Sequence, residues 1–482
     1  MFNHLNHILK KHPIILIILF ALLLRMSFFL VLHPWTWTPQ DFINNSYNDD
    51  RGYESLARYI VEGFGYLELD SAKIDYRIWQ ADIMGYRTAG YPLFVSFFFY
   101  IFGFIYWPVF LTQILLDLLV VLLIHLIACK IYPRHGVPFV APLLYSLDLM
   151  PVFYCLTIRT DAPGTFLFTL FIYALMIAKE RGWRTGDFAA LGLILGVATH
   201  VRLILLYFSP FIGLYFLFDR AFIMRGSKHI LKSMVILYLV FFLILSPWVY
   251  RNMRVYGSPA LSSLPGIHMC MYHAGYLKYK IDDVGFYDAF HEICDESVVG
   301  VDNPFDESSL WVGKSVEYLS QHPAEYMANH IESVLLLFTR PMTYDSRFHD
   351  TFKDEFAAVG VSAKTFKSVT SFFVGAKILL EAIFLLPGLV ILLWDRRRRF
   401  HSMVFLITLL FFANLVGVVS WHAGGRLKLP ILPLIVISSS VGICSLAWKI
   451  KSLKIVRIES VGGAKTIHVC CPWKTRRRPR QK

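Results

Sequence analysis

Long apolar runs recur along most of this chain, beginning with residues 13–33. About 20 consecutive apolar residues are needed to cross the hydrocarbon core of a bilayer. Inside lipid, only helices and closed barrels satisfy every backbone polar group. The sequence is 56% hydrophobic and 17% charged, whereas soluble domains average about 25% charged residues. We therefore expect an all-α polytopic membrane protein.

The segments expected to span the membrane share an apolar composition and a length near one crossing. They are 13–33, 107–129, 137–156, 161–178, 188–202, 203–218, 230–249, 372–394, 402–420 and 428–448. Two shorter apolar stretches, 91–105 and 328–341, could cross fully, enter halfway or lie in the interface. The pattern predicts a bundle of about 10–12 transmembrane helices, with interfacial helices in the outer loops.

Clusters of Lys and Arg mark the loops that should face the cytoplasm. They lie at 179–184, at 220–232, at 396–399 and from Lys449 onward. With these loops inside, the outer side receives 34–90, about 157–160, 250–371 and 421–427. The segment 250–371 is too long for a simple connector, and we expect it to cover part of a site.

The net charge of +13 follows mostly from this topology. It does not indicate a nucleic-acid-binding surface, and the expected partners include membrane lipids. We divide the chain into a transmembrane part, 1–445, and a basic cytoplasmic tail, 446–482. Cys270 and Cys294 share the large outer loop, and their spacing leaves open whether they form a disulfide.

Two adjacent acids, Asp49 and Asp50, follow the first apolar run. A carboxylate at the membrane boundary costs free energy unless it is exposed, paired or functional. It could accept a proton from a hydroxyl group, bind a metal, or cap the amphipathic helix that begins here. Tyr53 lies one turn later, on the apolar stripe of that helix.

A third acid and several arginines are expected at the same membrane face. The acid is Asp161, and the arginines are Arg87, Arg202, Arg251 and Arg426. Arginine pairs bidentately with phosphate. A pocket with carboxylates and arginines suits a phosphate-bearing lipid and a hydroxyl acceptor. Because a phosphate leaves as a stable anion, one carboxylate base plus cations would suffice for glycosyl transfer.

Each of these residues also has a structural explanation. Asp161 begins a span and could cap it. Arg202 could form an ion pair between apolar runs. Arg251 could belong to an aromatic belt in which its head group reaches water.

In this order and topology, the motifs resemble the polytopic GT-C glycosyltransferases, specifically the family of protein O-mannosyltransferases and lipid A aminoarabinose transferases. The resemblance runs through roughly 10–445. It rests on Asp49-x-x-x-Tyr53, Arg87-x-x-Gly90-Tyr91-Pro92, Asp161, Arg202, Pro247-Trp248-x-x-Arg251-Asn252 and Arg426-x-Lys428-x-Pro430. Leu427 departs from the family pattern, in which a Tyr often precedes the Arg/Lys-Leu-Pro element.

The resemblance implies inverting transfer of a sugar from a polyprenyl-phosphate donor to the hydroxyl group of a glycan, lipid or protein. Asp49 would be the catalytic base, with Asp50 as the alternative if the register slips by one residue. Asp161 would be the second outer acid. The arginines would bind the donor phosphate, Arg87 and Arg426 foremost, followed by Arg202 and Arg251. The substrate pocket would include Tyr53, Tyr91 and Trp248.

No cofactor is certain from the resemblance, and a divalent metal is left open. The sequence has no CxxC pair or HExxH helix that would indicate zinc. The absence of an appended soluble domain favours a bacterial-type enzyme of the inner membrane, with its site on the periplasmic face.

Two other functions compete with this interpretation. A transporter or flippase could use Asp117, His125 and Asp148, which lie within apolar segments. No inverted repeat supports it, and the charges gather at one face instead of the midplane. The third alternative is a noncatalytic membrane scaffold, against which the clustering of Asp and Arg argues.

Overall fold

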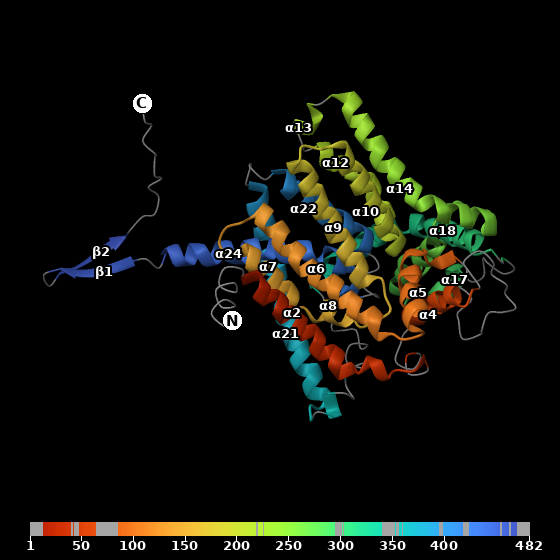
Figure 1. Cartoon of the computed structure of the whole chain (residues 1–482), viewed down its shortest axis with the longest axis horizontal. Helices are drawn as coiled ribbons and strands as arrows, with labels where there is room; N and C mark the ends of the chain where they lie inside the picture. The colour runs from red at the N-terminus through yellow and green to blue at the C-terminus, as the bar shows by residue number, and fades with distance from the viewer. Residues whose placement is uncertain are drawn as a thin grey trace.

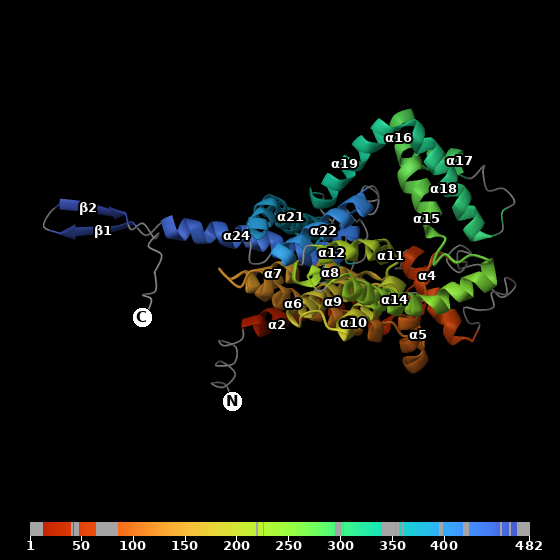
Figure 2. The ribbon, with the colours of Figure 1, turned by 90° about the horizontal axis from the view of Figure 1, so that it is seen from above.

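The computed structural model describes residues 13–39, 42, 48–63, 85–217, 220–224, 226–294, 301, 303–339, 352, 356–358, 360–394, 399–417, 424–453, 456–461 and 464–469. Helices make up nearly all of this part, and they pack as a bundle with a smaller group of helices on one side (Figures 1 and 2). The prediction of an all-α polytopic membrane protein is therefore confirmed.

Six helices in the described part are long and apolar enough to cross a membrane. They are α2 (Pro13–Leu32), α6 (Trp107–Ile131), α9 (Asp161–Glu180), α14 (Ser227–Tyr256), α21 (Ala363–Trp394) and α24 (Leu432–Leu453). Shorter apolar helices accompany them, namely α5 (Gly90–Phe102), α7 (Val137–Ser146), α10 (Thr185–Val201) and part of α22 (Arg399–Gly417).

Two segments expected as continuous spans are broken into pieces. Segment 137–156 forms α7 and the short α8 (Leu149–Tyr154), because Asp148 caps α8 by accepting a hydrogen bond from the Met150 amide at 2.9 Å. Segment 203–218 forms α11 (Ile204–Phe208), η4 (Ser209–Phe211) and α12 (Ile212–Leu217), with Pro210 at the break. The short α13 (Arg220–Ile223) follows.

The two ambiguous apolar stretches form helices shorter than one crossing. Stretch 91–105 lies in α5, and its 13 residues extend about 20 Å against the roughly 30 Å of a bilayer core. Stretch 328–341 lies largely in α19 (Pro323–Thr339), which buries Asn329, Ser333 and Leu337 along one side. Neither helix is long enough to cross a bilayer unaided.

A close helix crossing holds the C-terminal part of the bundle together. A Cβ atom on Gly388 of α21 would lie 1.8 Å from the Ser438 carbonyl oxygen of α24, and one on Gly442 would lie 2.5 Å from the Phe384 carbonyl oxygen. Only glycine allows the two backbones to approach this closely.

Helix α24 is preceded by η9 (Gly424–Ile431). It is followed by a hairpin of β1 (Val456–Val461) and β2 (Ala464–Val469).

The segment predicted as the large outer loop contains its own helical group. We call α15 (Leu264–Ile267), η5 (His268–Gly275), α16 (Tyr276–Asp282), α17 (Phe286–Cys294) and α18 (Pro304–Gln321) the loop helices. They stand off the bundle, and α19 leads back toward it (Figure 2).

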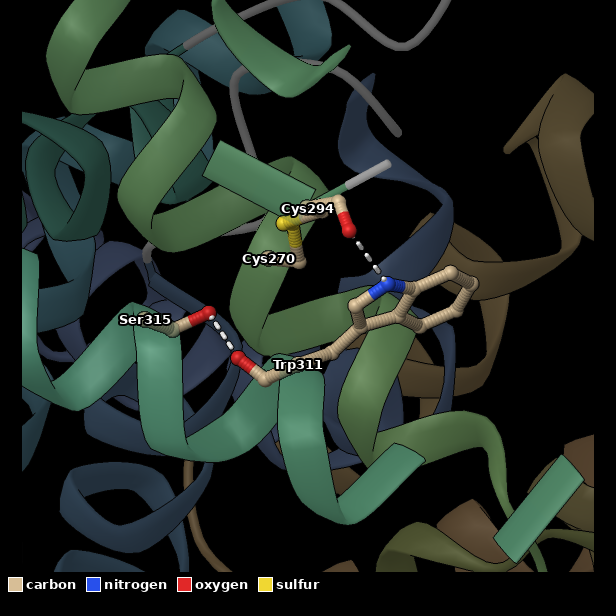
Figure 3. Close-up of a disulfide and its surroundings, with 4 residues drawn as sticks. All are labelled: Cys270, Cys294, Trp311 and Ser315. Atoms are coloured by element: carbon tan, nitrogen blue, oxygen red, sulfur yellow. Dashed lines mark hydrogen bonds between the residues drawn. A yellow bond between two sulfur atoms is a disulfide. The ribbon is translucent and has the colours of Figure 1, made fainter. Parts of the chain in front are cut away.

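A disulfide closes the core of the loop helices. Cys270 of η5 and Cys294 of α17 are bonded, with Cα atoms 6.4 Å apart, and both side chains are fully buried. Trp311 packs beside the bond and donates its indole N–H to the Cys294 carbonyl at 3.2 Å, while Ser315 donates to the Trp311 carbonyl (Figure 3). The sequence left this pairing open, and the structure resolves it as a bond.

A buried ion pair joins the first span to the bundle. Arg25 of α2 binds Asp117 of α6 through Nε at 2.8 Å and Nη2 at 2.7 Å, and it donates to the Ser146 carbonyl at 2.9 Å. Tyr145 donates to the other Asp117 oxygen at 2.6 Å. Both charged side chains are at most 2% exposed, so each depends on the other for a partner.

We predict that Asp117→Asn destabilises the protein by about 3–5 kcal/mol, because it leaves the Arg25 charge buried without its counter-charge. The combined change Arg25→Met and Asp117→Leu should cost less than either single loss of charge. Unfolding in detergent would measure both.

The exposed pair Lys314–Glu317 serves as the control. Its side chains are 52% and 62% exposed, so Glu317→Gln should change stability by less than about 1 kcal/mol. Equal stabilities for Asp117→Asn and Glu317→Gln would contradict the structural role of the buried pair.

Candidate active site

Helix α4 (Asn48–Val61) begins at the acid pair and points the two carboxylates into different surroundings. Both acids lie in the first turn, where a negative charge interacts favourably with the helix dipole. Successive residues of a helix point about 100° apart. The Asp49 side chain is 36% exposed, whereas the Asp50 side chain is 4% exposed. Two neighbours of one type therefore have different roles.

Asp50 is held in a buried ion pair with Arg159. The Arg159 guanidinium donates to the two Asp50 oxygens at 2.7, 3.0 and 3.1 Å, and the Arg159 side chain is 1% exposed. Its Cζ atom also lies 5.8 Å from the Tyr154 ring centroid. Since removing either partner would strand the other charge, this pair anchors α4 to the bundle.

Asp49 is the accessible acid, and Arg87 positions it. Arg87 donates to Asp49 Oδ1 at 3.0 Å, and the Arg87 side chain is 12% exposed. The guanidinium lies over Tyr53, with Cζ 4.1 Å from the ring centroid. One arginine therefore connects the candidate base to the aromatic residue one turn further along α4.

The predicted second acid and a predicted phosphate-binding arginine bind each other. Arg202, at the end of α10, donates to Asp161 Oδ1 at 2.8 Å. Asp161 begins α9 and is fully buried, and the Arg202 side chain is 10% exposed. Arg159 and Asp161 thus lie two residues apart and form two separate ion pairs, one with α4 and one with α10.

A glycine lets α5 begin directly against the end of α10. A Cβ atom on Gly90 would lie 2.6 Å from the His200 carbonyl carbon and oxygen, so no other residue fits without a shift. Thr88 donates to the same His200 carbonyl at 2.6 Å. This contact fixes the Arg87-x-x-Gly90 motif beside Arg202, two residues beyond His200.

Tyr91 is a fully buried residue that contacts Tyr53 and Gln113. It is 0% exposed, it packs edge to face with Tyr53 at a centroid distance of 5.0 Å, and it donates to Gln113 Oε1 at 3.0 Å. Gln113 donates in turn to the carbonyls of Cys155 and Thr157, at 3.1 and 2.8 Å. Asp50 and Asp161 both lie within electrostatic range of the Tyr91 phenol.

Side chains of the Trp248 motif bind backbone carbonyls of residues 260–261, just after α14. Trp248 donates its indole N–H to the Leu261 carbonyl at 2.8 Å, and Asn252 donates to the Ala260 carbonyl at 2.7 Å. Arg251 is 2% exposed, lies 4.9 Å from the ring centroids of both Trp248 and Tyr256, and donates to Asn252 Oδ1 at 2.9 Å. Trp248 and Arg251 are thus engaged in packing.

Basic residues of η9 lie near a second buried network. Arg426 belongs to η9, but its side chain lies outside the described residues. Lys428 is 2% exposed, and the charges of Asp148 and Glu381 act on it. Lys377 binds both of these acids, each at 2.6 Å. Asp148, one of the residues that suggested a transport path, is therefore held in an ion pair.

His268, the first residue of η5, approaches the site from the loop helices. The Asp49 carboxylate lies close enough for its charge to act on the imidazole. Desolvation lowers the pKa of His268 to about 4, against the opposing influence of Asp49. Its imidazole is therefore neutral at pH 7.

Within the described ranges, no group of three or more His, Cys, Asp and Glu side chains could hold a metal ion. The carboxylates that converge here are each paired with an arginine instead, at Asp49, Asp50 and Asp161.

Sequence reasoning missed three residues of this cluster. Arg159 directly precedes Thr160 and Asp161, and an arginine beside apolar spans signals a buried partner. Gln113 is polar within an apolar helix, which signals a buried hydrogen bond. His268 had no signal of this kind, because only the fold brings it to Asp49.

One family model matches the chain. Residues 87–250 match the family described as dolichyl-phosphate-mannose-protein mannosyltransferase. The matched segment includes Arg87, Tyr91, Asp161, Arg202 and Trp248, whereas Asp49 precedes it. No curated protein matches the chain significantly.

Solved structures of two membrane enzymes are similar to the chain. The oligosaccharyltransferase AglB from Archaeoglobus fulgidus, in complex with an inhibitory peptide and a dolichol-phosphate, is 13% identical, with a TM-score of 0.48; the match covers 94% of this chain and 53% of that one. ArnT from Cupriavidus metallidurans bound to undecaprenyl phosphate is 12% identical, with a TM-score of 0.33, over 92% and 80% of the two chains. The chain thus spans about half the length of the archaeal enzyme.

The match over residues 87–250 agrees with the motifs of the sequence, and over that segment the chain is similar to the family described as dolichyl-phosphate-mannose-protein mannosyltransferase.

Proposed function

We propose that the protein is an inverting glycosyltransferase that moves a sugar from a polyprenyl-phosphate donor to a hydroxyl acceptor at the outer face of the membrane. The observation that carries this proposal is the contrast between Asp49 and Asp50. Asp49 is accessible and held at 3.0 Å by Arg87, whereas Asp50 is buried against Arg159. The family match supports polyprenyl-linked glycosyl transfer.

In the proposed reaction, an Asp49 oxygen accepts the proton of the acceptor hydroxyl as that oxygen attacks the anomeric carbon. The bond from the anomeric carbon to the phosphate oxygen breaks on the opposite face of the sugar. The lipid phosphate leaves with the electron pair, so the sugar inverts its configuration. No general acid is required, because the phosphate is already a stable anion.

Arg87 is the described cation best placed to bind the departing phosphate. Its guanidinium has five N–H donors, so it can bind Asp49 and a phosphate oxygen together. Arg426 stays a proposed phosphate ligand from the motif. Arg202 and Arg251 are proposed as supports, because the first binds Asp161 and the second packs between Trp248 and Tyr256.

The proposed donor is a polyprenyl-phosphate-linked sugar, and the proposed acceptor is a glycan, lipid or protein with a free hydroxyl group. AglB was solved in complex with a dolichol-phosphate and ArnT bound to undecaprenyl phosphate, and both ligands are lipid phosphates of the kind that would carry the sugar in the proposed donor. We propose the bacterial inner membrane as the location, with the site on the periplasmic side.

The residues that suggested a transporter all have partners within the fold. Asp117 binds Arg25, Asp148 binds Lys377, and His125 bonds through Nδ1 with the Pro138 carbonyl at 2.7 Å. Ion pairs and hydrogen bonds between helices explain these polar residues without a transport path.

We predict that Asp49→Asn lowers transfer by about 10²–10⁴-fold without loss of stability, because it removes the general base from an accessible position. Mass spectrometry of lipid-linked sugars and envelope glycoconjugates would compare cells with the wild-type, deleted and Asp49→Asn genes. Both mutants should accumulate the donor and lack one sugar on the same product.

Asp282→Asn is the matched control, because Asp282 is 37% exposed and binds Lys278 at 2.7 Å, much as Asp49 binds Arg87. That variant should glycosylate normally. Asp50→Asn should instead lower stability by about 3–5 kcal/mol, because Arg159 loses its buried partner. Full transfer by Asp49→Asn would sink the proposal, and a stable but inactive Asp50→Asn would move the base to Asp50.

We predict that Arg87→Gln weakens binding of polyprenyl phosphate by about tenfold or more, because a hydrogen bond to a charged group contributes about 1.5–3 kcal/mol. Undecaprenyl phosphate is the probe, and its effect on the melting temperature of the purified protein is the measurement.

Arg58→Gln is the control for this experiment. Arg58 also lies over an aromatic ring, Phe104, and binds an acid of its own helix, Glu54. Unchanged binding in Arg87→Gln, or equal weakening in both variants, would assign the phosphate to other cations.

A further inference from the structure

Helix α5 lies against α4 at the edge of the bundle and is apolar on nearly every side (Figure 1). Its 13 residues extend only about 20 Å, which is too short to cross a bilayer. Tyr91 and Phe99 lie on its buried side. Leu93, Phe97 and Ile101 follow one another at intervals of four, so they form a stripe along the opposite side. Each of the three is at least 50% exposed, so no described part of the chain covers this stripe.

Both ends of α5 are attached to α4. Just before α5 begins, Arg87 donates to Asp49 in the first turn of α4 at 3.0 Å. Just after α5 ends, the Tyr106 hydroxyl donates to Glu54 of the same helix at 3.1 Å. The helix therefore begins and ends beside α4, at the membrane face that carries Asp49, and it does not cross the membrane.

A continuous row of aromatic rings connects Arg87 to the exposed side of α5. The Arg87 guanidinium lies over the first ring, with Cζ 4.1 Å from the centroid of Tyr53. Neighbouring rings then follow with centroid distances of 5.0, 5.7, 5.2 and 5.3 Å, in the order Tyr53, Tyr91, Phe94, Phe98 and Phe97. The row thus begins at a cation beside the candidate base and ends on the uncovered apolar stripe.

The cation distinguishes this stripe from an ordinary lipid-facing surface. Helix α14 exposes a stripe of the same spacing, Val235, Leu239 and Leu243, as a membrane helix is expected to do. Exchanging one acyl chain for another on such a surface gains little free energy, because lipid tails are as apolar as leucine. A lipid that carries a phosphate gains a charged hydrogen bond as well where an arginine stands at the head of the stripe. Charge complementarity therefore selects the occupant of α5.

We propose that the exposed stripe of α5 binds the polyprenyl chain of the donor lipid while Arg87 binds its phosphate. The chain runs from the phosphate along Leu93, Phe97 and Ile101, within the leaflet next to the site. Because α5 is attached to α4 at both ends, this surface holds the sugar-bearing phosphate at the depth of Asp49. The inference rests on the proposed glycosyl transfer and adds to it the surface that docks the lipid part of the donor.

The test is photo-crosslinking of the purified protein in phospholipid vesicles that contain a trace of undecaprenyl phosphate. The variant Phe97→p-benzoylphenylalanine reports the lipids that contact α5, and Leu239→p-benzoylphenylalanine on α14 is the matched control. Mass spectrometry measures the share of undecaprenyl phosphate among the captured lipids. We expect that share to be about tenfold or more higher at position 97, because only there does a hydrogen bond to a charged group retain the head group.

Two further measurements separate the head group from the chain and guard against a misfolded variant. Adding Arg87→Gln to the Phe97 variant should reduce the captured share to the level seen at Leu239, and uncharged undecaprenol should be enriched at neither position. The variant Ile101→p-benzoylphenylalanine places the reporter one turn further along the same stripe. It should repeat the pattern of the Phe97 variant if the chain follows α5.

The outcomes distinguish this inference from the proposed function. If undecaprenyl phosphate does not change the melting temperature of the wild-type protein, the proposed donor class fails and this inference fails with it. If the lipid binds through Arg87 but positions 97 and 101 capture no larger share than Leu239, ordinary lipid covers α5 and only the inference is overturned. Enrichment at Phe97 that persists in the Arg87→Gln protein would also overturn it, because the chain would then bind independently of that arginine.

Discussion

A buried arginine needs a carboxylate partner, and this requirement organises the candidate site. Arg159 and Asp161 lie two residues apart, and they pair with Asp50 and Arg202 respectively. The segment from Arg159 to Asp161 therefore connects α4 to α10 through two ion pairs. Breaking a buried pair leaves an uncompensated charge, so these contacts have few alternatives. The position of Asp49, one residue before Asp50, follows from them.

The two neighbouring acids of α4 differ in burial, and the proposed chemistry belongs to the accessible one. Asp50 is buried, and its ion pair with Arg159 anchors α4. Asp49 keeps access, because the next residue back along the helix points away from the buried partner. Arg87 then restrains the exposed carboxylate without enclosing it. The buried anchor at Asp50 lies directly beside the proposed base, so it would keep that carboxylate oriented at little entropic cost.

The helices could largely be predicted from the sequence, because hydropathy is a local property. The spans around α2, α6, α9 and α14 follow from their apolar runs. The break at Asp148 has a local cause, its cap on α8, whereas its ion pair with Lys377 of the distant α21 could not be predicted.

The same limit applies to the candidate site. Residue types at Asp49, Arg87 and Asp161 indicated charge chemistry at one face. Which acid is buried depended on Arg159, and the approach of His268 depended on contacts between the loop helices and residues 85–87. Which acid pairs with which arginine depends on tertiary structure, so it cannot be predicted from a sequence motif.

The disulfide between Cys270 and Cys294 has a consequence for the maturation of the protein. Such bonds form and persist in oxidising compartments, whereas the cytosol keeps thiols reduced. The bond joins η5 to α17 across a sequence separation of 24 residues, so a covalent link holds these two loop helices together even when single hydrogen bonds open. Formation of this bond is therefore part of the assembly of the loop helices. A reducing environment would leave their core held by packing and by the hydrogen bond of Trp311.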